Sequence, residues 1–208
     1  MSRKCGPGLF ARSAAIRRLA GSRFRVAAGL LLLALWPSRP SAQTALTAIE
    51  ATIAATYEEI GEISGSKLDS LLASADSSRL VLFDTRPVAE FEQSHIRKAI
   101  RVNPDASADA FFLAHDSLIR DKDVVLYCSV GYRSSILAVR LQQRALESGA
   151  TSVANLRGGL FRWYNEGRPV FNSAGETDEI HPYDTWWGRL IDRREPATKV
   201  GEPQKGGS

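Results

Sequence analysis

The residues best suited to chemistry lie where an apolar run ends at a cysteine. Residues 124–127 are apolar and β-favouring; after Cys128 come a short loop, Arg133 and a segment without Pro or Gly up to Ser148. This order predicts a buried strand, a tight loop and a helix. The loop amides and the first helical turn point at one spot, where the helix dipole favours an anion. A thiolate is such an anion, so Cys128 is predicted to be a nucleophile.

The loop after the cysteine has the properties of an anion-binding loop. Gly131 permits a bend that brings backbone amides together, and the Arg133 guanidinium offers a fixed fork of donors. A buried structural cysteine is the competing interpretation, and it accounts for a lone cysteine but not for this loop. The predicted substrate-binding residues are Ser129, Val130, Gly131, Tyr132, Arg133 and Ser134.

The first 42 residues differ from the rest in charge. They hold eight Lys and Arg, and the first acidic residue of the chain is Glu50. A basic segment, the apolar run 26–36 and the small residues Ser41 and Ala42 predict a secretory signal peptide over 1–42, and hence export, to a periplasm. The apolar run is too short for a bilayer of about 30 Å, so no stable membrane span is expected unless the leader is retained. A mitochondrial transit peptide and an uncleaved anchor are the alternatives.

Charge and cysteine content narrow the function further. The chain has 27 basic residues, eight of them in the leader, so the rest of the chain has 19 basic and 23 acidic residues and is net acidic. This charge balance does not favour a surface that binds nucleic acid. Cys5 belongs to the leader, which leaves Cys128 without a disulfide partner and its thiol free to react. No Cys-x-x-Cys pair and only three His are present, so we expect no metal and no cofactor.

The remaining segments alternate as in an α/β fold. A mostly parallel sheet with helices on both faces is predicted, with Asp84 and Cys128 at the carboxyl ends of strands, where such sheets bind ligands. Strands are predicted over residues 63–64, 80–83, 99–102, 124–127 and 153–156. Helices are predicted over residues 45–60, 67–74 with Ser66 as N-cap, 88–94, 106–119, the segment after Arg133 and 160–166. Residues 74–79 are predicted to form a loop, and Pro169 begins a segment that leads out of the domain.

Four motifs occur in order between residues 60 and 172. They are Asp-Thr-Arg at 84–86, a Phe-x-x-x-His-Ile segment at 91–99, the cysteine loop at 128–133, and Gly-Gly-x-x-x-Trp at 158–163 followed by Gly-Arg-Pro-Val at 167–170. Together they resemble the rhodanese family of sulfurtransferases. Lys98 departs from the family pattern, because it stands where the family usually has Gly.

The resemblance implies a sulfurtransferase that works in two steps. The Cys128 thiolate would take a sulfane sulfur from thiosulfate, a polysulfide or a persulfide. A thiol or cyanide would then remove this sulfur, and the acceptor thiol could also belong to another protein. Arg133 would bind the leaving sulfite or the donor anion. Asp84 would pin the loop or an arginine, and Arg86 would pair with Glu90 or Asp84, both in supporting roles.

Two further residues of the motifs are expected to be structural. His95 resembles a packing and hydrogen-bonding residue of the family, and Trp163 a core residue. Val130 and Tyr132 are uncharged, so the loop offers a donor anion no cation beyond Arg133. This favours a polysulfide or persulfide donor over thiosulfate.

Other functions compete with sulfur transfer. A rhodanese-like binding or regulatory module with little turnover is one alternative. A cysteine phosphatase or arsenate reductase is less favoured, because related phosphatases use Cys-x5-Arg and this chain has the shorter Cys-x4-Arg.

The predicted organisation has four parts. The leader at 1–42 precedes a lead-in helix at 43–61, a rhodanese domain at 62–175 and a C-terminal extension at 176–208. Adjacent tryptophans at 186–187 are too apolar for a free tail, so the extension is expected to pack beside the site or to bind a partner. The chain from Asp192 onward is expected to be disordered.

Overall fold

The structure is a computed structural model that describes residues 41–192. The predicted signal peptide, apart from its last two residues, and the predicted disordered end of the chain, apart from Asp192, lie outside the described residues. The prediction of disorder is wrong at Asp192, whose N–H donates to Asn165 Oδ1 at 3.0 Å. No helix in the described part is long and apolar enough to cross a membrane.

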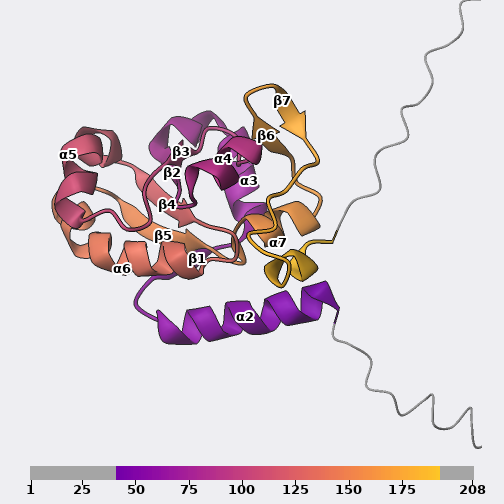
Figure 1. Ribbon diagram of the computed structural model, residues 1–208. Coiled ribbons are helices and arrows are strands. Elements are labelled where there is room, and N and C mark those ends of the chain that lie inside the picture. Colours follow the sequence, from indigo (N-terminus) through magenta and orange to yellow (C-terminus); the bar gives the residue numbers. More distant parts are fainter. Residues whose placement is uncertain (1–40, 193–208) are drawn as a thin grey trace, which may run out of the picture. The chain divides into compact units, whose positions relative to one another are not determined.

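A five-stranded parallel sheet forms the centre of the fold (Figure 1). From one edge to the other its strands are β1 (Gly61–Ile63), β5 (Ser152–Leu156), β4 (Asp123–Tyr127), β2 (Leu80–Asp84) and β3 (Ile100–Arg101). Asp84 at the end of β2 lies opposite Tyr127 at the end of β4. The predicted α/β fold with a mostly parallel sheet is confirmed, and the residue after Tyr127, Cys128, lies at the carboxyl edge of the central strand.

Helices cover both faces of the sheet, because alternate strand residues enter two separate apolar clusters. Phe83 and Leu126 enter the first cluster with residues of α5 (Ala108–Ile119) and α6 (Tyr132–Glu147). Leu82 and Val125 enter the second, on the opposite face. That face is covered by α3 (Gly65–Ala73) and α7 (Gly159–Asn165), and α4 (Val88–Gln93) follows β2.

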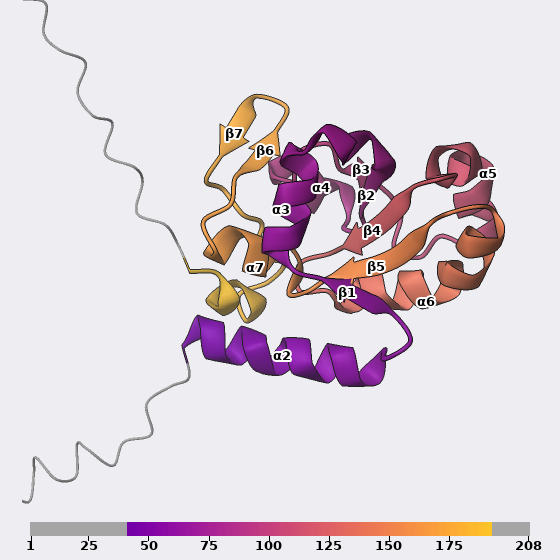
Figure 2. The same ribbon diagram turned by 180° about the vertical axis from the view of Figure 1, so that it is seen from behind.

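The lead-in helix and the C-terminal tail pack together against the domain. The helix α2 (Ala42–Thr56) lies beside the short helix η2 (Trp187–Leu190) in both views (Figures 1 and 2). Their shared apolar cluster contains Leu46, Ile53, Val130, Phe161 and Leu190. Because Val130 belongs to the cysteine loop, both flanking segments share an apolar cluster with that loop.

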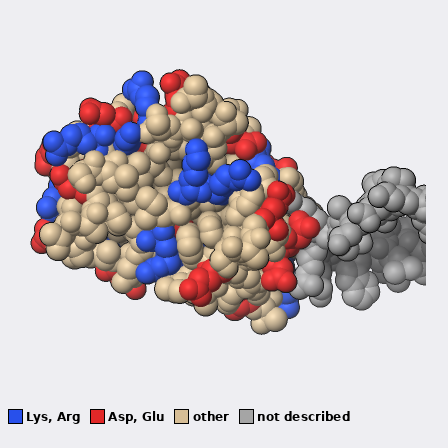
Figure 3. All heavy atoms as spheres, turned by 90° about the horizontal axis from the view of Figure 1, so that it is seen from above, with Lys and Arg blue, Asp and Glu red and all other residues tan. Residues whose placement is uncertain are grey.

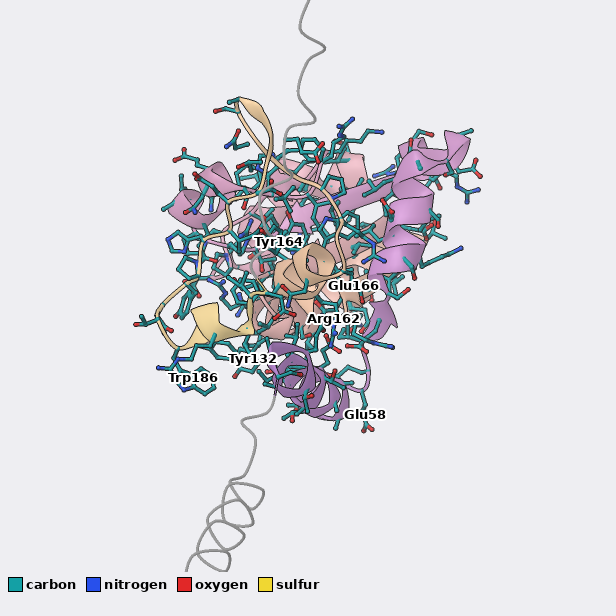
Figure 4. The ribbon with its side chains drawn as sticks, turned by 90° about the vertical axis from the view of Figure 1, so that its right-hand side faces the viewer. Glu58, Tyr132, Arg162, Tyr164, Glu166 and Trp186 are labelled. Carbon is teal, nitrogen blue, oxygen red and sulfur yellow. The ribbon has the colours of Figure 1, made fainter. Side chains whose placement is uncertain are left out.

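A polar contact also holds α2 in place. Arg162 on α7 points toward α2 (Figure 4), and its Nε lies 2.7 Å from Glu50 Oε1. The side chain of Arg162 also bonds Thr47 on the same helix. These contacts fix α2 against the part of the domain that carries the cysteine loop.

Several elements differ from the sequence-based prediction. Ser64, not Ser66, caps α3, because its hydroxyl accepts the Lys67 N–H at 3.2 Å. The predicted loop before β2 contains a 3-10 helix, η1 (Ala75–Arg79). The exit segment forms a strand, β6 (Val170–Asn172), paired antiparallel with β7 (Gly175–Thr177). The remaining differences are shifts of a few residues at helix and strand ends.

Candidate active site

Cys128 occupies a buried position between β4 and α6. Its side chain and backbone are 1% exposed. The Cys128 carbonyl accepts the Leu160 N–H at 2.8 Å, and the Ser129 carbonyl accepts the Phe161 N–H at 2.9 Å. These two bonds attach the loop to the first turn of α7, so the loop is held from a second element as well as from its own strand and helix.

The turn into α6 directs a backbone donor at the sulfur. The Gly131 N–H donates to Cys128 Sγ at 3.2 Å. Gly131 has φ +101° and stands at the N-cap of α6, a left-handed conformation that favours glycine. The sulfur therefore lies at the positive end of a 16-residue helix.

Ser134 and Ser135 hold this turn in place. Both hydroxyls donate to the Gly131 carbonyl, at 3.1 and 2.8 Å, and the Ser134 hydroxyl also lies 2.7 Å from Asn155 Oδ1 on β5. Ser134 is completely buried and does not line the cavity described below. Its place in the structure is that of a support for the loop.

Arg133 is held by a carboxylate from a different part of the chain. Its Nη1 and Nη2 donate to Glu90 Oε1 and Oε2, both at 3.0 Å, and Nη2 also bonds the Ser129 hydroxyl at 3.0 Å. The Ser129 hydroxyl in turn donates to Glu90 at 2.9 Å. Glu90 is 3% exposed. The three side chains form one closed network beside the cysteine.

This network keeps Arg133 protonated. Burial alone would lower the pKa of Arg133, but its hydrogen bonds to the Glu90 carboxylate and the negative charge of a Cys128 thiolate raise it above its ordinary value. The cation is thus permanent, and much of its charge is offset by Glu90 before any substrate arrives. The sequence predicts Glu90 as a partner of Arg86 and not of Arg133. The position of Glu90 on α4, one turn after Asp84-Thr85-Arg86, is the signal that brings it to the same sheet edge as Cys128.

Asp84 and Arg86 form a separate buried ion pair. Arg86 Nη2 lies 2.7 Å from Asp84 Oδ2, and both side chains are fully buried. Arg86 Nη2 also donates to the Ser94 carbonyl at 2.5 Å. Burial lowers the pKa of Arg86, but the charge of Asp84, its hydrogen bond and the smaller contributions of Tyr127 and Glu90 together raise it more, so the net shift is upward. The predicted pairing with Asp84 is confirmed, and neither residue lines the cysteine cavity.

His95 and Trp163 have structural roles, as the sequence predicts. His95 stacks on Phe91 with ring centroids 4.0 Å apart, and its Nδ1 bonds the Phe91 carbonyl at 2.9 Å. Trp163 is 2% exposed, and its Nε1 donates to the Pro169 carbonyl.

The cysteine faces a cavity of about 300 Å³. Two of its lining residues, Tyr183 and Trp187, come from the C-terminal tail, which therefore packs beside the site. The Arg133 guanidinium lies 5.2 Å from the centre of the Tyr183 ring. The lining residues are Cys128, Ser129, Val130, Tyr132, Arg133, Tyr183 and Trp187.

The comparisons with known proteins decide the family. The model of the rhodanese-like domain matches residues 67–166. A sulfurtransferase from Allochromatium vinosum is 31% identical over 116 residues, which are 56% of this chain and 99% of that protein. The chain belongs to the rhodanese-like family. A tRNA uridine(34) hydroxylase from Pectobacterium atrosepticum is 30% identical over 104 residues, which are 49% of this chain and 28% of that protein.

Two solved structures are also similar to this chain, at lower identity. A thiosulfate sulfurtransferase from Pseudomonas aeruginosa has a TM-score of 0.46 and 22% identity, covering 70% of this chain and 26% of that one. An As-Sb reductase from Leishmania major has a TM-score of 0.47 and 21% identity, covering 54% of this chain and 86% of that one.

The rhodanese-like match leaves both flanking segments outside it. The matched residues include Cys128, Arg133 and Glu90, but α2 precedes them and Tyr183 and Trp187 follow them. Part of the wall of the cysteine cavity therefore comes from segments that the family model does not describe. Within residues 41–192 no group of three His, Cys, Asp or Glu is placed to hold a metal ion.

Proposed function

We propose that this rhodanese-like protein is a sulfurtransferase that carries a sulfane sulfur on Cys128 as a persulfide. The observation that carries the proposal is the position of Cys128 Sγ, which receives the Gly131 N–H at the start of α6. Arg133 beside it is a permanent cation. A relative named as a sulfurtransferase, matched over 99% of its length, supports the same class of reaction.

The first step would be attack of the Cys128 thiolate on the outer sulfur of a donor. The donor's S–S bond breaks, and its electron pair leaves with the remaining fragment, which is sulfite when the donor is thiosulfate. The Gly131 N–H and the helix dipole favour negative charge on the sulfur, as preorganised donors do at a developing anion. In the second step a thiophilic acceptor attacks the outer sulfur and returns Cys128 to the thiolate.

The donor we propose is a polysulfide or an organic persulfide. Thiosulfate carries two negative charges and needs cations to replace its hydration. Arg133 is the one cationic side chain among the described residues lining the cavity, and Glu90 already binds both of its terminal nitrogens. A donor with less charge loses less on entering this cavity.

Mass spectrometry of the intact protein tests the sulfur carrier. We expect the purified protein to gain one sulfur atom, about 32 Da, on treatment with polysulfide, and to lose it on addition of cyanide. The Cys128→Ser protein is the control and should gain nothing. A protein that stays unloaded with polysulfide and with thiosulfate would contradict sulfur transfer and favour a binding module. Loading of the Ser variant would place the sulfur elsewhere.

A further inference from the structure

A second cavity adjoins the one above Cys128. It has a volume of about 380 Å³ and is bounded on one side by α2. Val130, Tyr132 and Trp187 line both cavities, so the two meet at these three side chains. We call the second cavity the α2 cavity; its other lining residues are Ala48, Ile49, Thr52 and Ile53.

The walls of the α2 cavity are apolar and aromatic. None of its described lining residues carries a charge. The one hydroxyl among its α2 residues, that of Thr52, donates to the Ala48 carbonyl of the same helix at 2.9 Å. Tyr132 extends between α2 and the tail (Figure 4), with its ring 6.0 Å from that of Tyr57 in an edge-on arrangement. A ligand here would gain from burying apolar surface.

The cysteine cavity supplies little that could bind a strongly charged ligand. Its one described cation, Arg133, is paired with Glu90 through two hydrogen bonds and with Ser129 through a third. A carboxylate drawn into either cavity would lose its hydration without gaining an unpaired cation. The face of the molecule seen from above is different, because it carries both acidic and basic side chains among uncharged ones (Figure 3).

We propose that the α2 cavity binds the body of the sulfur acceptor, and that this acceptor is a small organic thiol with an uncharged, apolar body. The inference rests on the proposed function, since it needs a sulfur on Cys128. The volumes of the two cavities, about 300 and 380 Å³, suit a small molecule that places its thiol at Cys128 and its apolar end against α2.

The transfer that this geometry serves balances without an oxidant or a reductant. The thiol gives its proton to water, and its thiolate attacks the outer sulfur of the Cys128 persulfide. A new S–S bond forms in the acceptor, and the bond between Cys128 Sγ and the outer sulfur breaks. The electron pair of that bond stays on Cys128 Sγ, and the product is an organic persulfide.

The test separates loading from discharge. Cys128 is first loaded with polysulfide and its mass recorded; the discharge rate is then measured with ethanethiol, butanethiol, hexanethiol and glutathione at equal thiolate concentration. We expect the second-order rate constant to rise about threefold for each added methylene, as for burial of an apolar chain. Glutathione, which is charged, should be slower than butanethiol by about tenfold or more.

Two substitutions on α2 locate the effect. Ile49 lines the α2 cavity, whereas Ala51 is exposed on the same helix. We expect Ile49→Ser to flatten the dependence on chain length while loading by polysulfide and discharge by cyanide stay unchanged. Ala51→Ser should behave as the parent protein. Circular dichroism of both variants checks that α2 is intact.

The outcomes distinguish the two proposals. If Cys128 takes no sulfur, sulfur transfer itself fails, and this inference with it. If Cys128 is loaded but ethanethiol, hexanethiol and glutathione discharge it equally, the apolar acceptor is wrong and sulfur transfer stands. A reduced protein with an exposed cysteine is also tested as the acceptor. If it discharges Cys128 faster than hexanethiol does, the small apolar acceptor is wrong and a protein acceptor is favoured.

Discussion

Glu90 and Arg133 form a bidentate ion pair next to the candidate nucleophile, with both N–O distances at 3.0 Å. Glu90 lies on α4 and Arg133 on α6, so the pair joins the elements that follow β2 and β4. The pair orients the guanidinium and, at the same time, offsets its charge. Donor selectivity and loop stability should therefore both depend on one carboxylate.

Replacing Glu90 with Gln removes the charge and keeps one acceptor oxygen. We expect the KM for thiosulfate to fall about three- to tenfold, because Arg133 then presents more net charge to an anion. The free energy of unfolding should fall by about 1–3 kcal/mol, since hydrogen bonds to a charged group are lost. Steady-state kinetics with thiosulfate and urea denaturation measure the two effects.

Glu92→Gln is the matched control for this substitution. Glu92 is exposed on the same helix. Its replacement by Gln removes the same charge from the protein and leaves the contacts of Arg133 unchanged. It should leave both quantities unchanged. An equal drop in thiosulfate KM for the two variants would mean that the overall charge of the protein, and not the Glu90–Arg133 pair, determines the KM for thiosulfate.

Gly159 allows α7 to approach the cysteine loop closely. It has φ +54°, and a Cβ at this position would lie 2.4 Å from the Cys128 carbonyl oxygen. Gly159→Ala should therefore cost about 3 kcal/mol of unfolding free energy or more, and should slow sulfur loading of the folded protein by displacing the loop. Urea denaturation and mass-monitored loading give the two values.

Gly167 separates backbone strain from crowding. It has φ +84°, but a Cβ there meets nothing within 4 Å. Gly167→Ala should cost only about 1 kcal/mol, with loading unchanged. Similar losses for the two alanine variants would show that the contact with Cys128 is not the source of the Gly159 effect.

The Asp84–Arg86 pair supports the fold away from the reacting atoms. Both side chains are fully buried, so Asp84→Asn leaves the Arg86 charge without its carboxylate and should cost about 3–5 kcal/mol. The combined change Asp84→Leu and Arg86→Met should recover part of this loss, because it removes both buried charges. Thermal unfolding of the parent and both variants makes the comparison.

Sulfur loading distinguishes a structural role from a chemical one. At a temperature where the Asp84→Asn protein is folded, Cys128 should load at the parent rate, because Asp84 does not line the cavity. Slow loading by a fully folded variant would assign Asp84 to the reaction.

The elements around Cys128 could be predicted because local sequence determines them. The apolar run of β4, the glycine at the turn and the long segment without Pro or Gly specify strand, loop and helix. Asp84 and Cys128 were placed at the same sheet edge by the rule that parallel strands end together, and the register of β2 on β4 confirms this.

The partners of the site residues could not be predicted in the same way. Glu90 and Arg133 are 43 residues apart, and Tyr183 and Trp187 come from a tail with no regular pattern. Such contacts depend on how elements pack, which periodicity does not encode. The hairpin of β6 and β7 was missed because its strands have only three residues each, too short for an alternating pattern.

Lys98 shows how a departure from the family pattern is accommodated. The family usually has Gly here, and Lys98 keeps a left-handed backbone with φ +65°. A non-glycine residue in this conformation is strained by about 1–2 kcal/mol. Lys98→Gly should therefore raise the free energy of unfolding by about 0.5–1 kcal/mol, after the larger entropy of glycine in the unfolded chain is included. Urea denaturation measures the change, and activity should not alter.

Lys98→Ala is the control that separates strain from the side-chain contact. Lys98 Nζ lies 3.3 Å from the Ser77 hydroxyl, a bond that both variants lose. Alanine keeps the Cβ and hence the strain, so its stability should be equal to or slightly below that of the parent. A glycine variant no more stable than the alanine variant would contradict the expected strain, because it would mean that the strain at Lys98 is no larger than the entropy cost of glycine in the unfolded chain.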